Sequence, residues 1–96
     1  MKPDIQTSNI ELNDHLKDLI QSKVDKLDHF KSYLIDIVFY LSDNGVNSKE
    51  TEIKAIVKDQ TLFCKEQEET LEKSIDKAIE KMQRQLRKYK EKKIEK

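Results

Sequence analysis

An alternating pattern of side chains marks residues 34–41, which read LIDIVFYL. Side chains of an extended chain point to opposite faces in turn, and β-branched and aromatic residues favour such a chain. One face would carry Ile35, Ile37, Phe39 and Leu41, and the other Asp36, Val38 and Tyr40. The stretch therefore predicts a strand that buries the first of these two faces.

Two further strands are predicted on the carboxyl side of this stretch. Residues 42–48, SDNGVNS, contain the single Gly of the chain and are rich in turn-forming residues, so they predict a loop. Alternation then resumes, with Ile53, Ala55 and Val57 on the inward face. Residues 58–60 make a tight connection to residues 61–65, where Leu62 and Cys64 would also point inward. These two segments predict a β-hairpin.

Helical periodicity appears on both sides of the predicted strands. The first apolar stripe consists of Leu16, Leu19, Ile20, Val24, Leu27 and Phe30, with Asn13 as the expected N-cap and an end near Phe30. The second consists of Leu71, Ile75, Ala78, Ile79, Met82, Leu86 and Tyr89, with Thr70 as the expected N-cap. Two amphipathic helices are therefore expected.

A short opening strand over Asp4–Ser8, with Ile5 inward, completes the pattern, and Pro3 places it at a sheet edge. The predicted order is β-α-β-β-β-α. The fold class is α+β, a two-layer sandwich with both helices on one face of a four-stranded mixed sheet. A right-handed crossover would make the first two strands parallel. We expect a single domain over residues 1–96, with residues 81–96 forming the basic distal part of the second helix and a short tail.

The charges are unevenly distributed, although the 96 residues contain 19 basic and 19 acidic side chains. Residues 1–80 hold 11 basic and 17 acidic side chains, whereas residues 81–96 hold 8 and 2. On a helical wheel of about 100° per residue, one flank of the second helix carries Lys73, Lys77, Lys81, Arg84, Lys88 and Lys92. Such a cationic arc could follow a phosphate backbone, or it could be a solubilising surface.

Several other residues have both a structural and a functional interpretation. Lys23 and Lys26 on the first helix would extend the cationic arc if the helices lie side by side. Tyr89 could stack on a base, but its spacing favours a half-buried core position. Tyr40, Ile56 and Phe63 lie on the uncovered sheet face, where they could bind a protein partner or simply pack across strands.

Catalysis, cofactors and metals receive no support. Cys64 is the single cysteine and is expected to be a small buried residue, while His15 and His29 lie far from it in sequence. No metal-ligand spacing, Gly-rich phosphate loop or small-molecule site is apparent. No apolar stretch approaches the roughly 20 residues of a membrane span, and the first residues lack a signal-peptide pattern. We expect a cytoplasmic protein that is not an enzyme.

The second helix also supports a family resemblance. Residues 79–90, IEKMQRQLRKYK, together with Ser74-Ile75-Asp76, resemble that helix of the ribosome hibernation promoting factors, a group also called ribosome-associated inhibitor A or sigma-54 modulation proteins. The most specific part is Arg84-Gln85-Leu86 with Lys88 and Lys90. Residues 22–30, SKVDKLDHF, resemble the end of the family's first helix. The strand and helix order matches the family fold over essentially the whole chain.

The resemblance implies a ribosome hibernation factor that binds small-subunit rRNA near the channel for messenger and transfer RNA. Such a factor silences translation in stationary phase or under stress. The rRNA-binding residues carried over are Lys23, Lys26, Lys81, Arg84, Arg87, Lys88 and Lys90, and Lys77 and Lys92 extend the cationic arc. The alternatives are a protein-interaction adaptor that uses the open sheet face and a general structured-RNA binder.

Two departures from the family pattern accompany the resemblance. Glu72 stands where many members have an aromatic residue, four positions before the Asp that matches Asp76. The chain also ends soon after the second helix, which is expected of the short type that lacks a ribosome-pairing domain. In that type a separate small ribosome modulation factor is associated with pairing, and such a partner is left open here.

Overall fold

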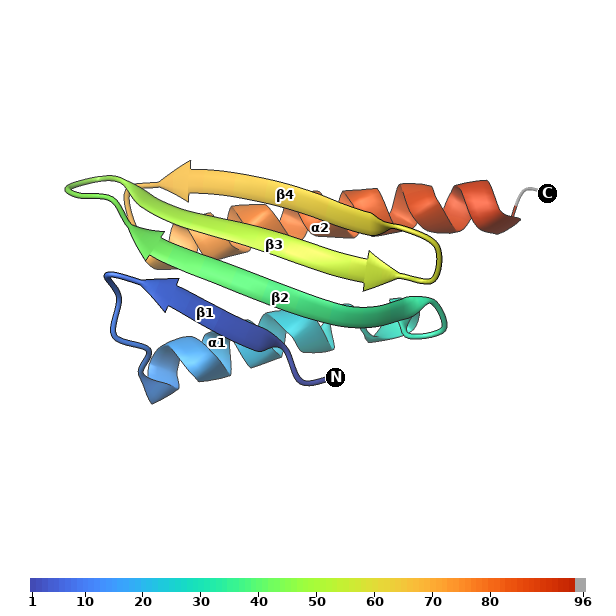
Figure 1. Cartoon of the computed structure of the whole chain (residues 1–96), viewed down its shortest axis with the longest axis horizontal. Helices are drawn as coiled ribbons and strands as arrows, with labels where there is room; N and C mark the ends of the chain where they lie inside the picture. Colours follow the sequence, from blue (N-terminus) through green and yellow to red (C-terminus); the bar gives the residue numbers. More distant parts are fainter. Residues whose placement is uncertain (95–96) are drawn as a thin grey trace.

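The computed structural model describes residues 1–94 of the chain. Its elements follow in the order β1 (Asp4–Ser8), α1 (Asp14–Asp25), a short 3₁₀ helix η1 (Asp28–Phe30), β2 (Leu34–Asp43), β3 (Lys49–Val57), β4 (Thr61–Glu68) and α2 (Leu71–Ile94). Both α-helices lie on the same side of one four-stranded sheet (Figure 1). The predicted α+β two-layer fold is confirmed.

The sheet has the strand order β1-β2-β3-β4. β1 pairs with β2 in parallel, with Ile5 beside Phe39, whereas β2, β3 and β4 form antiparallel pairs. Phe39 lies beside Ile53, and Ile53 beside Cys64, so the inward residues of neighbouring strands meet in register. The parallel first pair and the hairpin of β3 and β4 are as predicted.

The core fills the layer between the sheet and the two helices. The sheet contributes the side chains of Ile37, Phe39, Ile53 and Ala55, all of them fully buried. From α2 come Ile75, Ala78, Met82 and Leu86, which are equally inaccessible to solvent. The caps are also as predicted, because Asn13 accepts from Leu16 N at 2.9 Å and Thr70 Oγ1 accepts from Lys73 N at 3.2 Å.

One polar pair is sealed inside this core, between β3 and α2. Thr51 Oγ1 and Ser74 Oγ lie 2.7 Å apart, and both residues are inaccessible to solvent. Ser74 Oγ also donates to the Leu71 carbonyl at 2.8 Å. Because a hydroxyl has one proton and the carbonyl can only accept, Thr51 is the donor in the Thr51–Ser74 hydrogen bond.

Several details of the prediction are wrong. β2 continues through Ser42 and Asp43, which were predicted as loop, and β4 runs to Glu68 and not only to residue 65. The α-helix of the first stripe ends at Asp25 and not near Phe30, and the backbone there turns into η1, which still buries Phe30. At the start of β2 the register with β3 shifts between Leu34 and Asp36. This irregularity buries Leu34 and leaves Ile35 59% exposed, the reverse of the predicted facing.

Candidate nucleic-acid-binding surface

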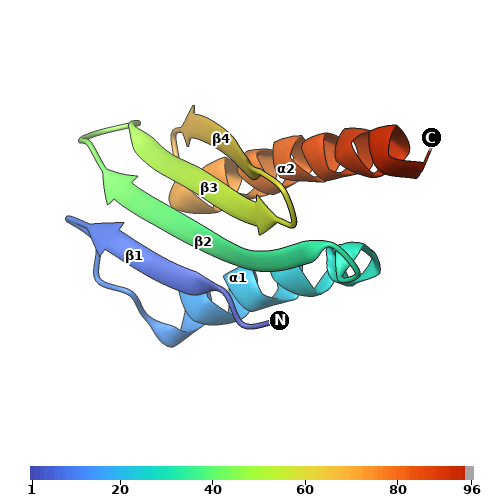
Figure 2. The same cartoon turned by 45° about the vertical axis from the view of Figure 1, so that its right-hand side comes forward.

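α2 presents its charged residues on two flanks of a buried stripe. One flank faces α1, since Glu72 Oε2 lies 3.8 Å from His15 Nε2 and Asp76 Oδ1 lies 2.6 Å from Lys23 Nζ. The other flank lies beside the edge strand β4, to which Lys77 and Lys81 are ion-paired. In Figures 1 and 2 the distal end of α2 continues past the turn between β3 and β4.

The proximal cations of the predicted arc are neutralised by carboxylates. Lys73 Nζ lies 3.4 Å from Glu69 Oε1, Lys77 Nζ lies 2.9 Å from Glu68 Oε2, and Lys81 Nζ lies 2.9 Å from Glu66 Oε2. The hydrogen bond to Glu68 and its negative charge raise the pKa of Lys77 above its ordinary value. Each of these lysines therefore has a carboxylate beside its ammonium group.

The distal cations of α2 are differently placed. Arg84, Arg87, Lys88 and Lys92 are exposed and Lys90 is half-buried. Within residues 1–94, no carboxylate lies within 4.0 Å of any of these five cationic groups. By the helical wheel, Arg84, Lys88 and Lys92 lie on the β4 side, and Arg87 and Lys90 on the α1 side. Together they form the distal cation cluster.

The lysines of α1 do not extend the cationic arc. The helices lie side by side as expected (Figure 1). However, α1 faces the flank of α2 that carries Asp76, opposite Lys77 and Lys81. The side chain of Lys23 is only 21% exposed and is held by Asp76. Lys26 is exposed just after α1. The structure thus separates Lys23 and Lys26 from Lys81 and Arg84 by the width of α2.

Tyr89 and Cys64 belong to the core. Tyr89 is 5% exposed, its ring centroid lies 5.3 Å from that of Tyr33, and its hydroxyl donates to Asp59 Oδ1 at 2.8 Å. A ring so enclosed offers no face to a base. Burial raises the pKa of the Cys64 thiol to about 11, and its sulfur donates to the Ala78 carbonyl at 3.2 Å. A protonated, buried thiol is not a nucleophile.

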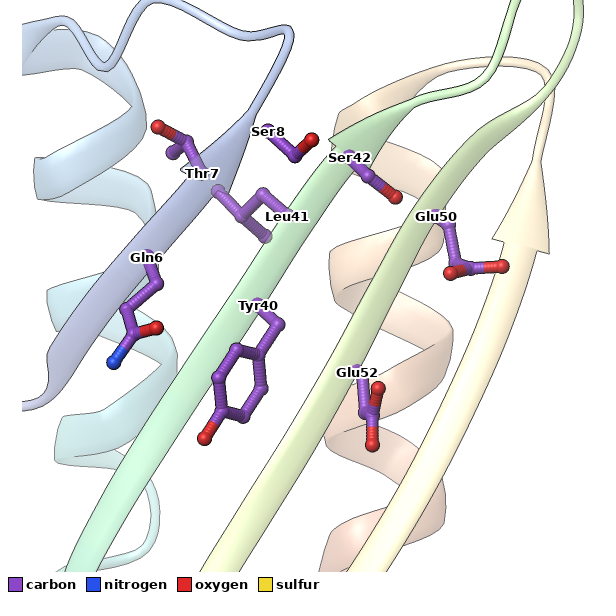
Figure 3. Close-up of a pocket in the computed structure, with 8 residues that line it drawn as sticks. All are labelled: Gln6, Thr7, Ser8, Tyr40, Leu41, Ser42, Glu50 and Glu52. Atoms are coloured by element: carbon purple, nitrogen blue, oxygen red, sulfur yellow. The ribbon is translucent and has the colours of Figure 1, made fainter.

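The open sheet face has a mixed character. Phe63 is 56% exposed, whereas Tyr40 and Ile56 are half-buried. Figure 3 shows Tyr40 between Gln6 and Glu52, in a shallow depression of about 300 Å³ that Glu50 also lines. The position of Tyr40 between side chains of the two neighbouring strands favours the interpretation that it packs across strands. Partner binding at Tyr40, Ile56 and Phe63 stays a prediction.

In the part of the chain that the structure describes, no group of three or more His, Cys, Asp or Glu residues could hold a metal ion. Among the same residues, neither helix has the length and apolar character needed to cross a membrane. The exposed Arg and Lys side chains of the distal cation cluster can pair with anionic groups and donate hydrogen bonds to them.

Comparisons with known proteins point to one family. Residues 4–94 match the family model described as sigma 54 modulation protein / S30EA ribosomal protein. A ribosome hibernation promotion factor of Picosynechococcus is 32% identical, and one of Bacillus subtilis is 30% identical. Each alignment covers 96% of this chain and 50% of the relative, so the chain spans about half the length of these curated relatives.

Solved structures share the fold. The N-terminal domain of Protein Y from Thermus thermophilus superposes with a TM-score of 0.84 at 21% identity, covering 93% of this chain and 99% of that domain. A ribosomal subunit interface protein from Coxiella burnetii gives a TM-score of 0.86 at 18% identity, covering 94% of this chain and 98% of the other. At these identities the likeness establishes the architecture.

Proposed function

Because the chain belongs to the sigma 54 modulation protein / S30EA ribosomal protein family, we propose that it is a ribosome hibernation factor that silences translation. Its target is the rRNA of the small ribosomal subunit near the channel for messenger and transfer RNA, under stress or in stationary phase. The observation that carries this proposal is the distal cation cluster, five basic side chains with no carboxylate of residues 1–94 within 4.0 Å.

The mechanism is occlusion without chemistry. Arg84, Arg87 and Lys88 would neutralise phosphates and release counterions, which is the main source of affinity for a nucleic acid. Structured RNA is recognised largely by shape, and a helix anchored along a sheet is a rigid surface for such recognition. A bound protein of this size would exclude other ligands of the channel. The site of action is the cytoplasm, where ribosomes work.

Charge reversal in the distal cation cluster tests the proposal. We expect Arg84→Glu combined with Lys88→Glu to weaken cosedimentation with small subunits by at least about tenfold at 0.1 M salt, because each lost phosphate contact removes roughly 0.7–0.9 from the log–log salt slope. The matched control is Lys54→Glu with Lys65→Glu, the same charge change on the open sheet face. Equal binding by both variants, or no cosedimentation of the wild type, contradicts the proposal.

General binding of structured RNA is the competing function, since the same cations would serve it. Competition by unrelated duplex RNA separates the two. A ribosome-specific factor should keep its small subunits at near-physiological salt in the presence of excess duplex, whereas a general binder should release them. Retention supports the hibernation function, and release supports the general binder.

A further inference from the structure

Two carboxylates of the edge strand β4 are aligned with two lysines of α2. Glu66 and Glu68 are two residues apart on one face of a strand, a spacing of about 6.6–6.8 Å. Lys77 and Lys81 are four residues apart on one row of a helix, a rise of about 6.0 Å. Because β4 and α2 run in opposite directions (Figure 1), Glu68 meets Lys77 and Glu66 meets Lys81, each at 2.9 Å. The two spacings match closely enough for both pairs to form together.

This alignment stops where the distal cation cluster begins. The inward positions of β4 change from Glu68 and Glu66 to Cys64 and Leu62, which carry no charge. Over the same stretch α2 passes from Lys81 to Arg84 and Lys88. Where α2 reaches these residues, Gln85 Nε2 donates a hydrogen bond to the Phe63 carbonyl of β4 at 2.6 Å. Glu66 lines one surface depression together with Lys81 and Arg84, but it is ion-paired to Lys81 only. The carboxylates of β4 therefore pair with the proximal lysines and leave the distal cations without a partner within 4.0 Å among residues 1–94.

The carboxylates are well placed to keep phosphate away from the proximal lysines. The side chains of Glu66 and Glu68 are 25% and 22% exposed, so neighbouring protein restricts their movement, whereas Lys77 and Lys81 are 56% and 50% exposed. A phosphate approaching either lysine meets a negative oxygen at hydrogen-bond distance from the same ammonium. Each pair is neutral as a unit, so little counterion release is gained by binding there.

We propose that Glu66 and Glu68 are specificity-determining residues of the RNA-binding surface, which occupy Lys77 and Lys81 and confine phosphate binding to the distal half of α2. The inference rests on the proposed function and refines it. Without these carboxylates, the row from Lys77 to Lys92 would offer cations over about 22 Å of helix, enough to follow any RNA backbone. With them, the row from Arg84 to Lys92 spans about 12 Å and suits only an RNA whose shape brings phosphates to that end.

The test compares two doubly neutralised variants. Glu66→Gln with Glu68→Gln releases Lys77 and Lys81, while Glu50→Gln with Glu52→Gln makes the same charge change on the open face, where Glu50 pairs with Lys65 at 3.6 Å. For an arbitrary duplex RNA, we expect the first variant to steepen the log–log salt slope by about 1.4–1.8 and to bind roughly tenfold more tightly at 0.1 M salt. The ratio of small-subunit to duplex affinity should fall accordingly.

Three controls keep the outcome interpretable. The single variants Glu66→Gln and Glu68→Gln should each give about half of the slope change, and thermal unfolding of every variant verifies the fold. Equal slopes for the two double variants, or an unchanged affinity ratio, overturn the inference. Failure of the wild-type protein to sediment with small subunits overturns the proposed function instead, so the two failures are distinguishable.

Discussion

Ser74 connects the two layers of the molecule through a hydrogen bond that no water reaches. Its hydroxyl accepts from Thr51 at 2.7 Å and donates to the Leu71 carbonyl at 2.8 Å. If a buried donor loses its acceptor, folding carries the full cost of removing that donor from water. If the donor itself is removed, no group is left unsatisfied as long as the acceptor keeps another hydrogen bond. The two residues of this pair are therefore not equivalent, although each contributes one hydroxyl.

The asymmetry predicts unequal effects of two substitutions. Ser74→Ala leaves the Thr51 hydroxyl without its partner, so the free energy of unfolding should fall by about 1–3 kcal/mol. Thr51→Val preserves shape and leaves Ser74 bonded to Leu71, so its cost should stay under about 1 kcal/mol. Urea denaturation followed by circular dichroism measures both. A larger loss for Thr51→Val than for Ser74→Ala would show that the donor assignment is wrong.

At the scale of elements, α2 has two halves with different neighbours. The proximal half is paired by charge to β4, and the distal half is held by Leu86, by Tyr89 and by Gln85 on the Phe63 carbonyl. Tyr89 reaches across to Asp59 in the turn between β3 and β4. This contact fastens the end of the helix on which the distal cation cluster depends.

Removing that hydroxyl should loosen the end of α2. We expect Tyr89→Phe to lower the free energy of unfolding by about 1 kcal/mol and to speed amide exchange in the last turns more than near Ile75. The matched control is Tyr40→Phe on the open face, for which the described residues give no hydroxyl hydrogen bond. Exchange in the last turns that is the same in both variants would contradict the anchoring role.

The element boundaries show how far periodicity predicts a fold. The apolar stripes of the helices, the alternation of the strands and both N-caps are local sequence patterns. The order of the elements and the placement of both helices on one sheet face followed from them. The end of α1 at Asp25 was missed because Leu27 and Phe30 stay buried through a 3₁₀ turn, so the apolar pattern outlasts the α-helix. The exposure of Ile35 was missed because a register shift against β3 is a pairing property, which a single strand does not reveal.

The candidate site was predictable in composition but not in pairing. The cationic arc was visible on a helical wheel, yet its division into paired and unpaired parts depends on Glu66 and Glu68 of another element. Likewise, the position of Lys23 beside Asp76 depends on which flank of α2 meets α1. The sequence contains a sign of this pairing, because Glu66 and Glu68 have strand spacing just before the helix. Only the alignment of β4 with α2 shows which lysines they meet.

At the scale of the whole molecule, the distal cation cluster belongs to one end of an elongated body. The described chain extends 47 Å along its longest axis and 21 Å and 18 Å across it. The distal cation cluster lies at the end where α2 passes the β3–β4 turn (Figure 2). The rest of the chain carries more acidic than basic side chains. A polyanion should therefore approach the molecule from that end.

The salt dependence of binding reports how many cations take part. Five contacts from the distal cation cluster predict a log–log slope of about −3.5 to −4.5, at roughly 0.7–0.9 per contact. Participation of Lys73, Lys77, Lys81, Lys23 and Lys26 as well would double the slope to about −7 to −9. Titration of small subunits at several salt concentrations distinguishes the two cases, and a slope near zero would contradict an electrostatic mechanism altogether.

The parallel pairing of β1 with β2 has a consequence for the order in which the protein assembles. Ile5 pairs with Phe39, and the whole of α1 lies between them in sequence. Ile53 pairs with Cys64, and only a short turn separates their strands. Closing a longer loop costs more chain entropy, and such distant contacts form slowly. The meander of β2, β3 and β4 with α2 can thus gather first, as a nucleus contiguous in sequence. β1, which precedes the other three strands in sequence, is then the last to find its place in the sheet.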